Sequence, residues 1–179
     1  MMLPSIVAPA QLAANARLAA TTPPGDFAEV GVFHGGSAEM LYRVARVQHR
    51  GLHLFDTFTG TPCSIDGLDK HKVDAEFAAP GAEARIRAAL PEARLYVGVY
   101  PDTHPIAMPK LAFVHCDCDQ YDSYIAVITR MWPLVVPGGV LLFDDYPYLA
   151  GAKRAVEEHF ASADLKLCLQ RYFVVKPRE

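Results

Sequence analysis

Residues 26–47 read DFAEVGVFHGGSAEMLYRVARV, and this stretch decides the fold. The apolar run DFAEVGVF predicts a buried strand, and the apolar residues after Ser37 recur at the spacing of a helix. The glycines between the two let the backbone approach a ligand closely, and the amino end of the helix offers free N–H groups. Strand, glycine-rich turn and helix in this order predict the first unit of a parallel α/β sheet.

Strand and helix keep alternating along the rest of the chain. We expect further strands at residues 52–56 (LHLFD), 93–99 (ARLYVGV), 111–117 (LAFVHCD) and, after a PGG turn, 140–145 (VLLFDD). The closing stretches LKLCLQ and RYFVVK leave no room for a crossover helix, so they predict an antiparallel hairpin. The predicted fold class is α/β: a Rossmann-like doubly wound sheet of about seven strands, mostly parallel, with an antiparallel C-terminal hairpin strand.

Length and composition predict one globular domain of an ordinary enzyme. The chain has 179 residues, of which 51% are hydrophobic and 21% are charged. We expect residues 1–179 to form a single domain, with residues 1–25 as an N-terminal helical extension whose helix runs from Pro9 to about Ala20. Residues 57–80 are polar and irregular, and a loop of this length in a compact domain is usually functional or mobile.

Charge, hydropathy and cysteine spacing argue against several classes of partner. The net charge of −3 comes without a basic block, which excludes nucleic acid as an expected partner. No stretch approaches the roughly 18 apolar residues of a membrane helix, and the N-terminus has no basic leader region. The cysteines show no zinc spacing and suggest buried thiols in a reducing cytosol: Cys63, Cys116, Cys118 and Cys168. We therefore expect a cytoplasmic protein.

Two pairs of aspartates end two of the predicted strands. Asp117 and Asp119 lie in HCDCDQ, and Asp144 and Asp145 lie in LLFDDY. Alternation along a strand would turn Asp117 and Asp119 into the cleft and the cysteines beside them away from it. Carboxylates gathered at one sheet edge repel one another, so they must share protons, be held apart or bind a cation. Oxygen ligands of this kind suit Mg²⁺ first, and Ca²⁺ or Mn²⁺ less well.

The glycine-rich turn and the acid after the second predicted strand indicate a nucleoside site. Asp56 stands where an acid commonly accepts hydrogen bonds from ribose hydroxyls. Phe33 replaces the second glycine of the dinucleotide fingerprint, and Glu29 adds negative charge close to where a phosphate would lie. Both features favour S-adenosylmethionine over NAD. The expected cofactor contacts are Glu29, Gly31, Phe33, Gly35, Ser37, Asp56 and Asp117.

Structural alternatives exist for several of these residues. The paired glycines could serve tight packing alone, and Ser37 could be a plain helix cap. Asp122, followed by a serine, is a candidate cap for the helix after the first aspartate pair. His34 could contact a cofactor or a substrate, whereas His115 falls on an apolar strand and is expected to be a hydrogen-bonded core residue.

Several segments, taken in order, resemble the macrocin O-methyltransferase family of class I methyltransferases. They are EVGVFHGGS, LHLFDTFTGTP, VGVYPDT, HCDCDQYDSY, LVVPGGVLLFDDY and GAKRAVEEHF, and the resemblance covers roughly residues 26–176. It implies transfer of a methyl group from S-adenosylmethionine to a hydroxyl of a small molecule, often a sugar, with Mg²⁺ bound. By position it implies Asp117, Asp144 and Asp145 as metal ligands and Asp119 as general base. Cys118 departs from the family, which generally has glycine there.

We therefore expect an S-adenosylmethionine-dependent, Mg²⁺-dependent O-methyltransferase that acts on a vicinal diol of a hydroxylated small molecule. One alternative is a metal-dependent glycosyltransferase that uses the D-x-D segment at Asp117, although basic residues for a diphosphate are missing there. The other is a non-catalytic protein that binds S-adenosylmethionine, since the chain is short for the family. A homo-oligomer is a further expectation, because a partner subunit could supply the missing lid.

Overall fold

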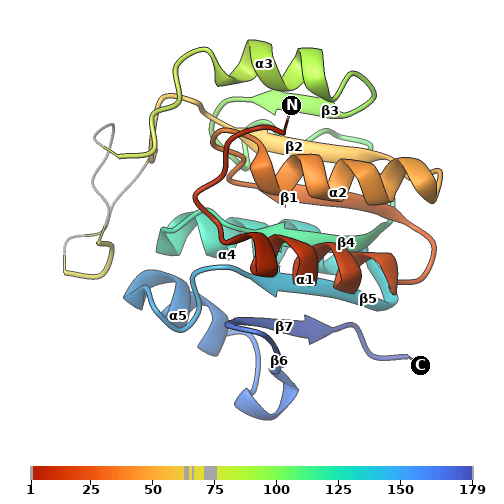
Figure 1. Ribbon diagram of the computed structural model, residues 1–179. Coiled ribbons are helices and arrows are strands. Elements are labelled where there is room, and N and C mark those ends of the chain that lie inside the picture. Colours follow the sequence, from red (N-terminus) through yellow and green to blue (C-terminus); the bar gives the residue numbers. More distant parts are fainter. Residues whose placement is uncertain (1, 63–64, 66, 71–75, 179) are drawn as a thin grey trace.

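The computed structural model describes residues 2–62, 65, 67–70 and 76–178, and in this part of the chain a seven-stranded sheet dominates (Figure 1). Its strands are β1 (Asp26–Val30), β2 (Leu52–Asp56), β3 (Arg94–Val97), β4 (Leu111–Cys116), β5 (Val135–Phe143), β6 (Lys166–Cys168) and β7 (Arg171–Val175). The order across the sheet is β3-β2-β1-β4-β5-β7-β6. Strands β3 through β5 pair in parallel, whereas β7 is antiparallel to β5 and β6 to β7. The predicted Rossmann-like fold class is confirmed.

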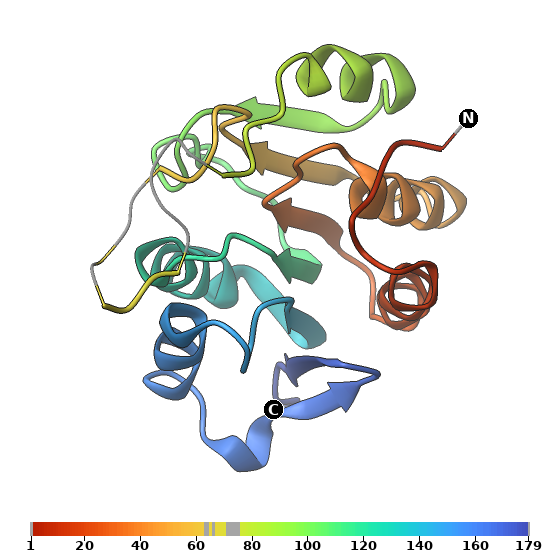
Figure 2. The same ribbon diagram turned by 60° about the vertical axis from the view of Figure 1, so that its left-hand side comes forward.

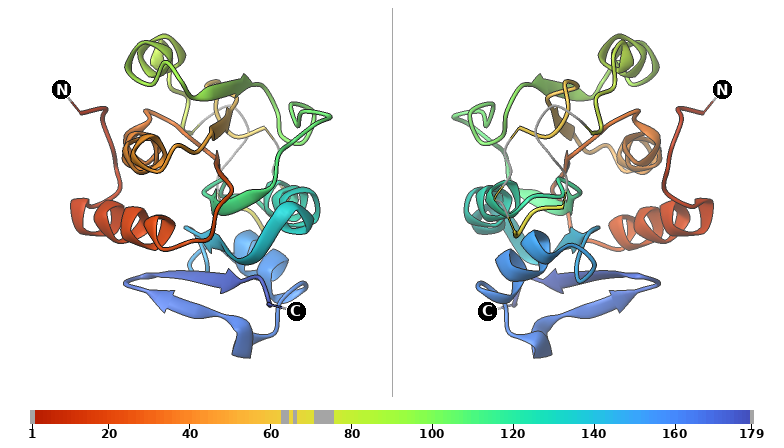
Figure 3. Two further views of the ribbon diagram at one scale, coloured as in Figure 1. Left: turned by 90° about the vertical axis from the view of Figure 1, so that its right-hand side faces the viewer. Right: turned by 90° about the vertical axis from the view of Figure 1, so that its left-hand side faces the viewer.

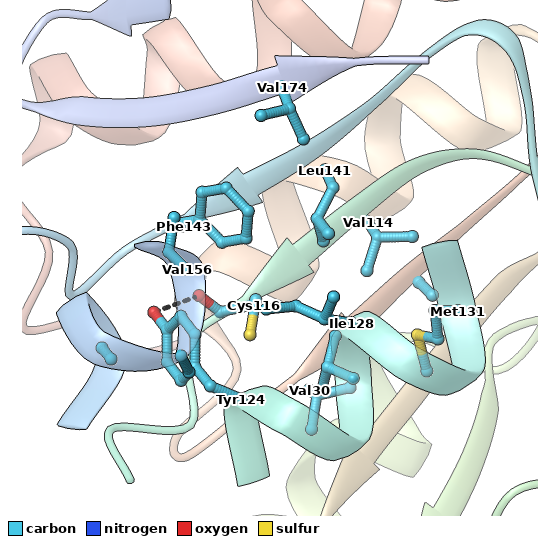
Figure 4. Packing of buried hydrophobic residues seen from close by; sticks show 14 of the residues in the cluster. Val30, Val114, Cys116, Tyr124, Ile128, Met131, Leu141, Phe143, Val156 and Val174 are labelled. Atoms are coloured by element: carbon cyan, nitrogen blue, oxygen red, sulfur yellow. Dashed lines mark hydrogen bonds between the residues drawn. The ribbon is translucent and has the colours of Figure 1, made fainter. Parts of the chain in front are cut away.

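Helices cover both faces of the sheet, as the views in Figures 2 and 3 show. They are α1 (Pro9–Ala20), α2 (Gly36–Val47), α3 (Ala82–Ala89), α4 (Tyr121–Met131) and α5 (Ala150–Glu157), with 3-10 turns η1 (Trp132–Leu134) and η2 (Ser162–Asp164). Buried residues of α1, α2 and α3 form one apolar cluster with Phe27, Phe113 and Leu142 of the sheet. Those of α4 and α5 form another on the opposite face with Val114, Leu141 and Phe143, drawn in Figure 4.

Both faces of the sheet are covered, and its central strand β4 is buried along its whole length. All six residues of β4 are buried, so no side of that strand faces water. From Phe113 onward its side chains alternate: Phe113 reaches the α1–α3 cluster, and Val114 and Cys116 reach the α4–α5 cluster. The carboxyl ends of β1, β2, β4 and β5 therefore meet at one edge with helices on both sides.

Strand β5 begins earlier than its sequence suggests. The PGG turn was expected to precede the strand, yet residues 137–139 lie within it. The pairing with β4 shifts from Leu111↔Val135 to Phe113↔Val140, so the extra residues bulge out of the ladder. Gly138 has φ +83°, and its N–H donates to the Lys176 carbonyl, so the bulge stays hydrogen-bonded on its outer side.

In the part of the chain that the structure describes, no helix has the length and apolar character needed to cross a bilayer. The sheet edge at the carboxyl ends of the parallel strands is instead the feature that positions a site. The strand order reverses between β1 and β4, and open α/β sheets bind ligands in the crevice outside such a point.

Candidate functional site

A cavity of about 350 Å³ opens at this edge of the sheet. Its walls come from the turns that follow β1, β2, β4 and β5, from residues 4–8 ahead of α1, and from Gln170 and Arg171 beside β7. The volume is in the range of pockets that hold small organic ligands. One cavity thus joins the glycine-rich turn to the aspartates.

Gly31 lets the ends of β1 and β4 come together. Its φ is +92°, and a Cβ added here would overlap the carbonyl group of Asp117. The Asp117 N–H donates to the Val30 carbonyl at 2.9 Å, and the Gly31 N–H donates to the Phe55 carbonyl at 3.0 Å. A side chain at this position would push the Asp117 segment away from the turn, so the glycine is needed for packing as well as for ligand approach.

Asp56 holds the glycine-rich turn against the end of β2. Its Oδ2 accepts hydrogen bonds from the backbone N–H groups of Val32 (2.6 Å) and Phe33 (2.7 Å), and its Oδ1 accepts one from Phe58 (2.6 Å). A carboxylate with three backbone donors is fixed in direction. The carboxylate also lines the cavity, so it can accept further bonds from a ligand with its remaining lone pairs.

The turn itself contains an unusual backbone conformation. Phe33 has φ +52°, a left-handed value that is uncommon for a bulky residue and that clusters at functional sites. Its ring contacts that of His34, with centroids 4.0 Å apart. Helix α2 then begins at Gly36 with Gly35 as its N-cap residue, so Ser37 lies inside the first turn rather than at the cap.

Residues before α1 cross the amino end of α2. The Leu3 N–H donates to Glu39 Oε2 at 2.6 Å, and a Cβ added at Gly36 would meet Ser5 and Pro4. Because Gly36 lacks a side chain, this segment can lie against the helix and form part of the cavity wall. This wall was not anticipated from the sequence.

All four aspartates line the far end of the cavity. Asp119 has φ +60°, and its N–H donates to Asp145 Oδ2 at 3.1 Å. The Tyr124 hydroxyl lies 2.9 Å from the same oxygen and 3.0 Å from the Cys116 carbonyl, the contact dashed in Figure 4. It also accepts the Asp145 N–H at 3.1 Å. Tyr124 of helix α4 therefore orients Asp145.

Asp144 is held from the other side by two cationic side chains. His115 Nε2 lies 3.2 Å from Asp144 Oδ1, and Arg171 Nε lies 2.8 Å from the same oxygen. The Arg171 N–H is not aligned on that oxygen, so the contact is an ion pair rather than a directed hydrogen bond. Both contacts use Oδ1, which leaves Oδ2 to another ligand.

The carboxyl groups perturb one another strongly. Burial, followed by the charges of Asp144 and Asp145, raises the pKa of Asp117 well above its usual value. Burial and the same two neighbours raise the pKa of Asp119 to about 8, and burial with Asp144 raises that of Asp145 to about 6. At Asp144, burial is outweighed by His115 and Arg171, which lower the pKa.

These residues fit a divalent cation. Carboxylates that cannot all be ionised together take up either protons or a cation, and oxygen ligands favour Mg²⁺. One ligand atom each from His115, Asp117 and Asp144 lie within 4.8 Å of one another. Asp117 and Asp144 were predicted as metal ligands together with Asp145, whose Oδ2 is engaged by Tyr124 and Asp119.

The structure distributes the other predicted residues as follows. Of the expected cofactor contacts, the cavity is lined by Gly31, Phe33, Gly35, Ser37, Asp56 and Asp117. Glu29 differs: its side chain is fully buried, bonds to His115 Nδ1 at 2.8 Å, and is not among the residues that line the cavity. On β1 the Glu29 side chain points to the face of the sheet that α1 and α2 cover. The geometry therefore does not support a direct contact between Glu29 and a cofactor.

Two smaller predictions need correction. Helix α4 begins at Tyr121, so Asp122 lies in its first turn and does not cap it. The Tyr121 N–H instead donates to Asp69 Oδ1 at 2.9 Å, a partner from the polar loop that no local pattern could reveal. Cys118, expected to face away from the cavity, lines it and also packs against the α4–α5 cluster, with its Sγ 3.6 Å from that of Cys116.

Among the histidines and cysteines, His34 lines the cavity, with Nδ1 3.4 Å from an Arg85 guanidinium nitrogen. His115 is buried and hydrogen-bonded as expected, but its link to Asp144 was not foreseen. Cys116, Cys118 and Cys168 are free thiols, and Cys63 lies outside the described residues.

With this geometry established, comparison with known proteins decides the family. The model of the macrocin-O-methyltransferase (TylF) family matches residues 11–172. The chain belongs to this family.

Individual relatives agree with the family model. The chain is 30% identical over 158 residues to demethyldecarbamoylnovobiocin O-methyltransferase of Streptomyces niveus, covering 79% of this chain and 60% of the relative. It is 33% identical over 141 residues to 8-demethyl-8-(2,3-dimethoxy-alpha-L-rhamnosyl)-tetracenomycin-C 4'-O-methyltransferase of Streptomyces olivaceus, covering 69% and 53%. The chain thus spans 60% of the length of the first relative and 53% of the length of the second.

The solved structure of the O-methyltransferase NovP shares the fold. It superposes with a TM-score of 0.82 at 24% sequence identity, covering 97% of this chain and 82% of that one. The Rossmann-like sheet with its antiparallel C-terminal strands is therefore shared with this solved structure.

The close approach at Gly31 gives a first testable prediction. We expect Gly31→Ala to lower the free energy of unfolding, measured by urea denaturation, far more than Gly67→Ala. Both glycines have positive φ, but an added Cβ at Gly67 meets nothing within 4 Å. The control should therefore lose only the left-handed penalty of about 1–2 kcal/mol. Equal losses would show that the Gly31–Asp117 contact is not limiting.

A second prediction concerns Tyr124. Removing its hydroxyl in Tyr124→Phe leaves the Asp145 N–H without its acceptor and takes one of two donors from both the Cys116 carbonyl and Asp145 Oδ2, so we expect a loss of about 1–3 kcal/mol in the free energy of unfolding in urea. Tyr148→Phe is the matched control: this residue is 62% exposed and donates to the Gln170 carbonyl at 3.2 Å. Its loss should stay within about 0.5 kcal/mol, and a Tyr124 variant as stable as that control would contradict the assignment.

Proposed function

We propose that this chain is an S-adenosylmethionine-dependent O-methyltransferase that acts on a hydroxyl of a sugar unit in a small-molecule natural product, with Mg²⁺ bound. The observation that carries the proposal is the continuity of one cavity from Asp56 and the glycine-rich turn to the four aspartates. A nucleoside donor at one end and an oxygen acceptor at the other would then meet near Asp117. Membership of the family and the activities of the two relatives support this proposal.

The nucleoside end offers the contacts that a methyl donor without phosphates needs. Asp56 presents carboxylate oxygens to the cavity, and the amino end of α2 is open there at Gly36 and Ser37. No Lys or Arg reaches the turn from α2, whose basic residues lie further along the helix at Arg43 and Arg46. The acidic surroundings suit a positively charged sulfonium better than a diphosphate.

The acidic end supplies the acceptor chemistry. Asp117, Asp144 and Asp145 would hold Mg²⁺, which would lower the pKa of an acceptor hydroxyl. Asp119 would take the hydroxyl proton, because its carboxyl group lines the same cavity two residues from Asp117. Tyr124 and the Asp119 N–H keep Asp145 in place, so these residues stay aligned. Holding donor and acceptor in line supplies much of the rate.

The first experiment tests donor, acceptor and cation together. Isothermal titration calorimetry should show binding of S-adenosylhomocysteine and no binding of UDP. Methyl transfer should be seen with a panel of rhamnosides that carry adjacent free or methylated oxygens, be lost with EDTA, and return with Mg²⁺. Binding of UDP instead would favour the glycosyltransferase alternative, and product binding without transfer to any acceptor would favour the non-catalytic one. Activity unaffected by EDTA would remove the cation from the scheme.

A substitution tests the general base. Asp119→Asn should lower kcat by about 10²–10⁴-fold, because it removes the proton acceptor, while S-adenosylhomocysteine binds as before. Asp122→Asn, an exposed acid in the first turn of α4, is the matched control and should retain wild-type kcat. Full activity in the Asp119 variant would exclude it as the base.

A further inference from the structure

Three polar side chains lie in a row beneath the acidic end of the cavity. Glu29 of β1 and His115 of β4 are register partners in the sheet, and Asp144 follows the end of β5. Glu29 is 0% exposed and His115 is 1% exposed. Groups buried this completely cost stability unless they are paired, so their arrangement calls for an explanation.

Both ring nitrogens of His115 face carboxylates. Nδ1 lies 2.8 Å from Glu29 Oε1, and Nε2 lies 3.2 Å from Asp144 Oδ1. The ring is therefore fixed at both ends, and Glu29 determines how it is presented to Asp144. Arg171 approaches the same Asp144 oxygen at 2.8 Å from β7. Oδ1 is thus anchored from two neighbouring strands.

The side chains of Glu29 and His115 lie below the wall of the cavity rather than in it. Their side chains share strand parity with Phe27 and Phe113, which pack in the α1–α3 cluster. Neither residue is among those that line the cavity, whereas Asp144 is. The contact between His115 and the Asp144 carboxylate therefore links this buried pair to the cavity.

We propose that Glu29 and His115 are positioning residues that orient the Asp144 carboxylate for binding of a divalent cation. The inference rests on the proposed function, because the cation is the one assigned to that site. Partners of this kind behind a metal ligand commonly change metal affinity by about 10–100-fold when they are removed. The assignment also gives Glu29 a role that its buried position allows, in place of a cofactor contact.

The sheet contains a matched control for this pair. His53 of β2 is also 1% exposed, with Nε2 3.0 Å from Asp26 Oδ2 and Nδ1 3.3 Å from the Tyr96 hydroxyl. Asp26 stands at the start of β1, at the end of the sheet opposite the cavity. Removing His53 disturbs an equally buried histidine, paired with a half-buried carboxylate, without touching the four aspartates of the cavity.

The test measures Mn²⁺ binding to the full chain by electron paramagnetic resonance of free Mn²⁺. His115→Gln and Glu29→Gln should weaken Mn²⁺ binding by about 10–100-fold relative to wild type. Both should keep S-adenosylhomocysteine affinity near that of wild type in calorimetry. His53→Gln should keep wild-type Mn²⁺ affinity even where its thermal stability falls as much. If His115→Gln does not fold, Glu29→Gln, which preserves side-chain shape, carries the comparison.

Other outcomes overturn the assignment and remain separable from failure of the proposed function. Wild-type Mn²⁺ affinity in the folded variants, or no Mn²⁺ binding by the wild-type chain, overturns the positioning role. Nitrogen hyperfine coupling in the wild-type Mn²⁺ spectrum would make His115 a direct ligand, which its place near Asp117 and Asp144 permits geometrically. The proposed methyl transfer fails separately, if the wild-type chain does not bind S-adenosylhomocysteine or transfers no methyl group to any acceptor.

Discussion

Repulsion among four buried or half-buried aspartates is the constraint around which this site is built. Asp117, Asp119, Asp144 and Asp145 share one end of a cavity above an apolar sheet, where charge is poorly screened. The surrounding groups each offset part of that repulsion: Tyr124 and a backbone N–H hold Asp145, and His115 with Arg171 holds Asp144. Asp117 keeps a pKa well above its usual value, so the cluster must take up either protons or a cation.

The fold was predictable because its signals are local. Apolar runs in alternation with helical spacing identified the parallel strands, and two adjacent short runs identified the closing hairpin. The error at β5 has a physical cause. A PGG sequence is typical of a turn, but here the neighbouring β4 strand and Lys176 supply hydrogen bonds that keep it within the ladder as a bulge. The strand pairing in the folded protein thus outweighs the local preference of the PGG segment for a turn.

The site was predictable to the extent that strand ends identify it. The aspartates and the glycine-rich turn follow apolar runs, so the sheet edge brings them to one cavity. Glu29 was misjudged, and the links from His115 to Asp144 and from Tyr121 to Asp69 were missed, because they depend on register between strands and on a loop far away in sequence. Parity within one strand is readable from the sequence, but the pairing of Glu29 with His115 across two strands is not. The pairing of buried polar side chains is therefore the part of a site that a three-dimensional structure reveals and a sequence does not.

The antiparallel hairpin has a geometric reason to follow five parallel strands. A parallel strand delivers its last residues to the carboxyl edge, whereas an antiparallel neighbour delivers its first residues there. Phe143 of β5 pairs with Tyr172 of β7, so Arg171, the first residue of β7, falls beside Asp144. A sixth parallel strand would need a crossover helix and would place its opposite end at that position. Reversal of β7 thus brings the Arg171 guanidinium group to Asp144, the least exposed of the four aspartates.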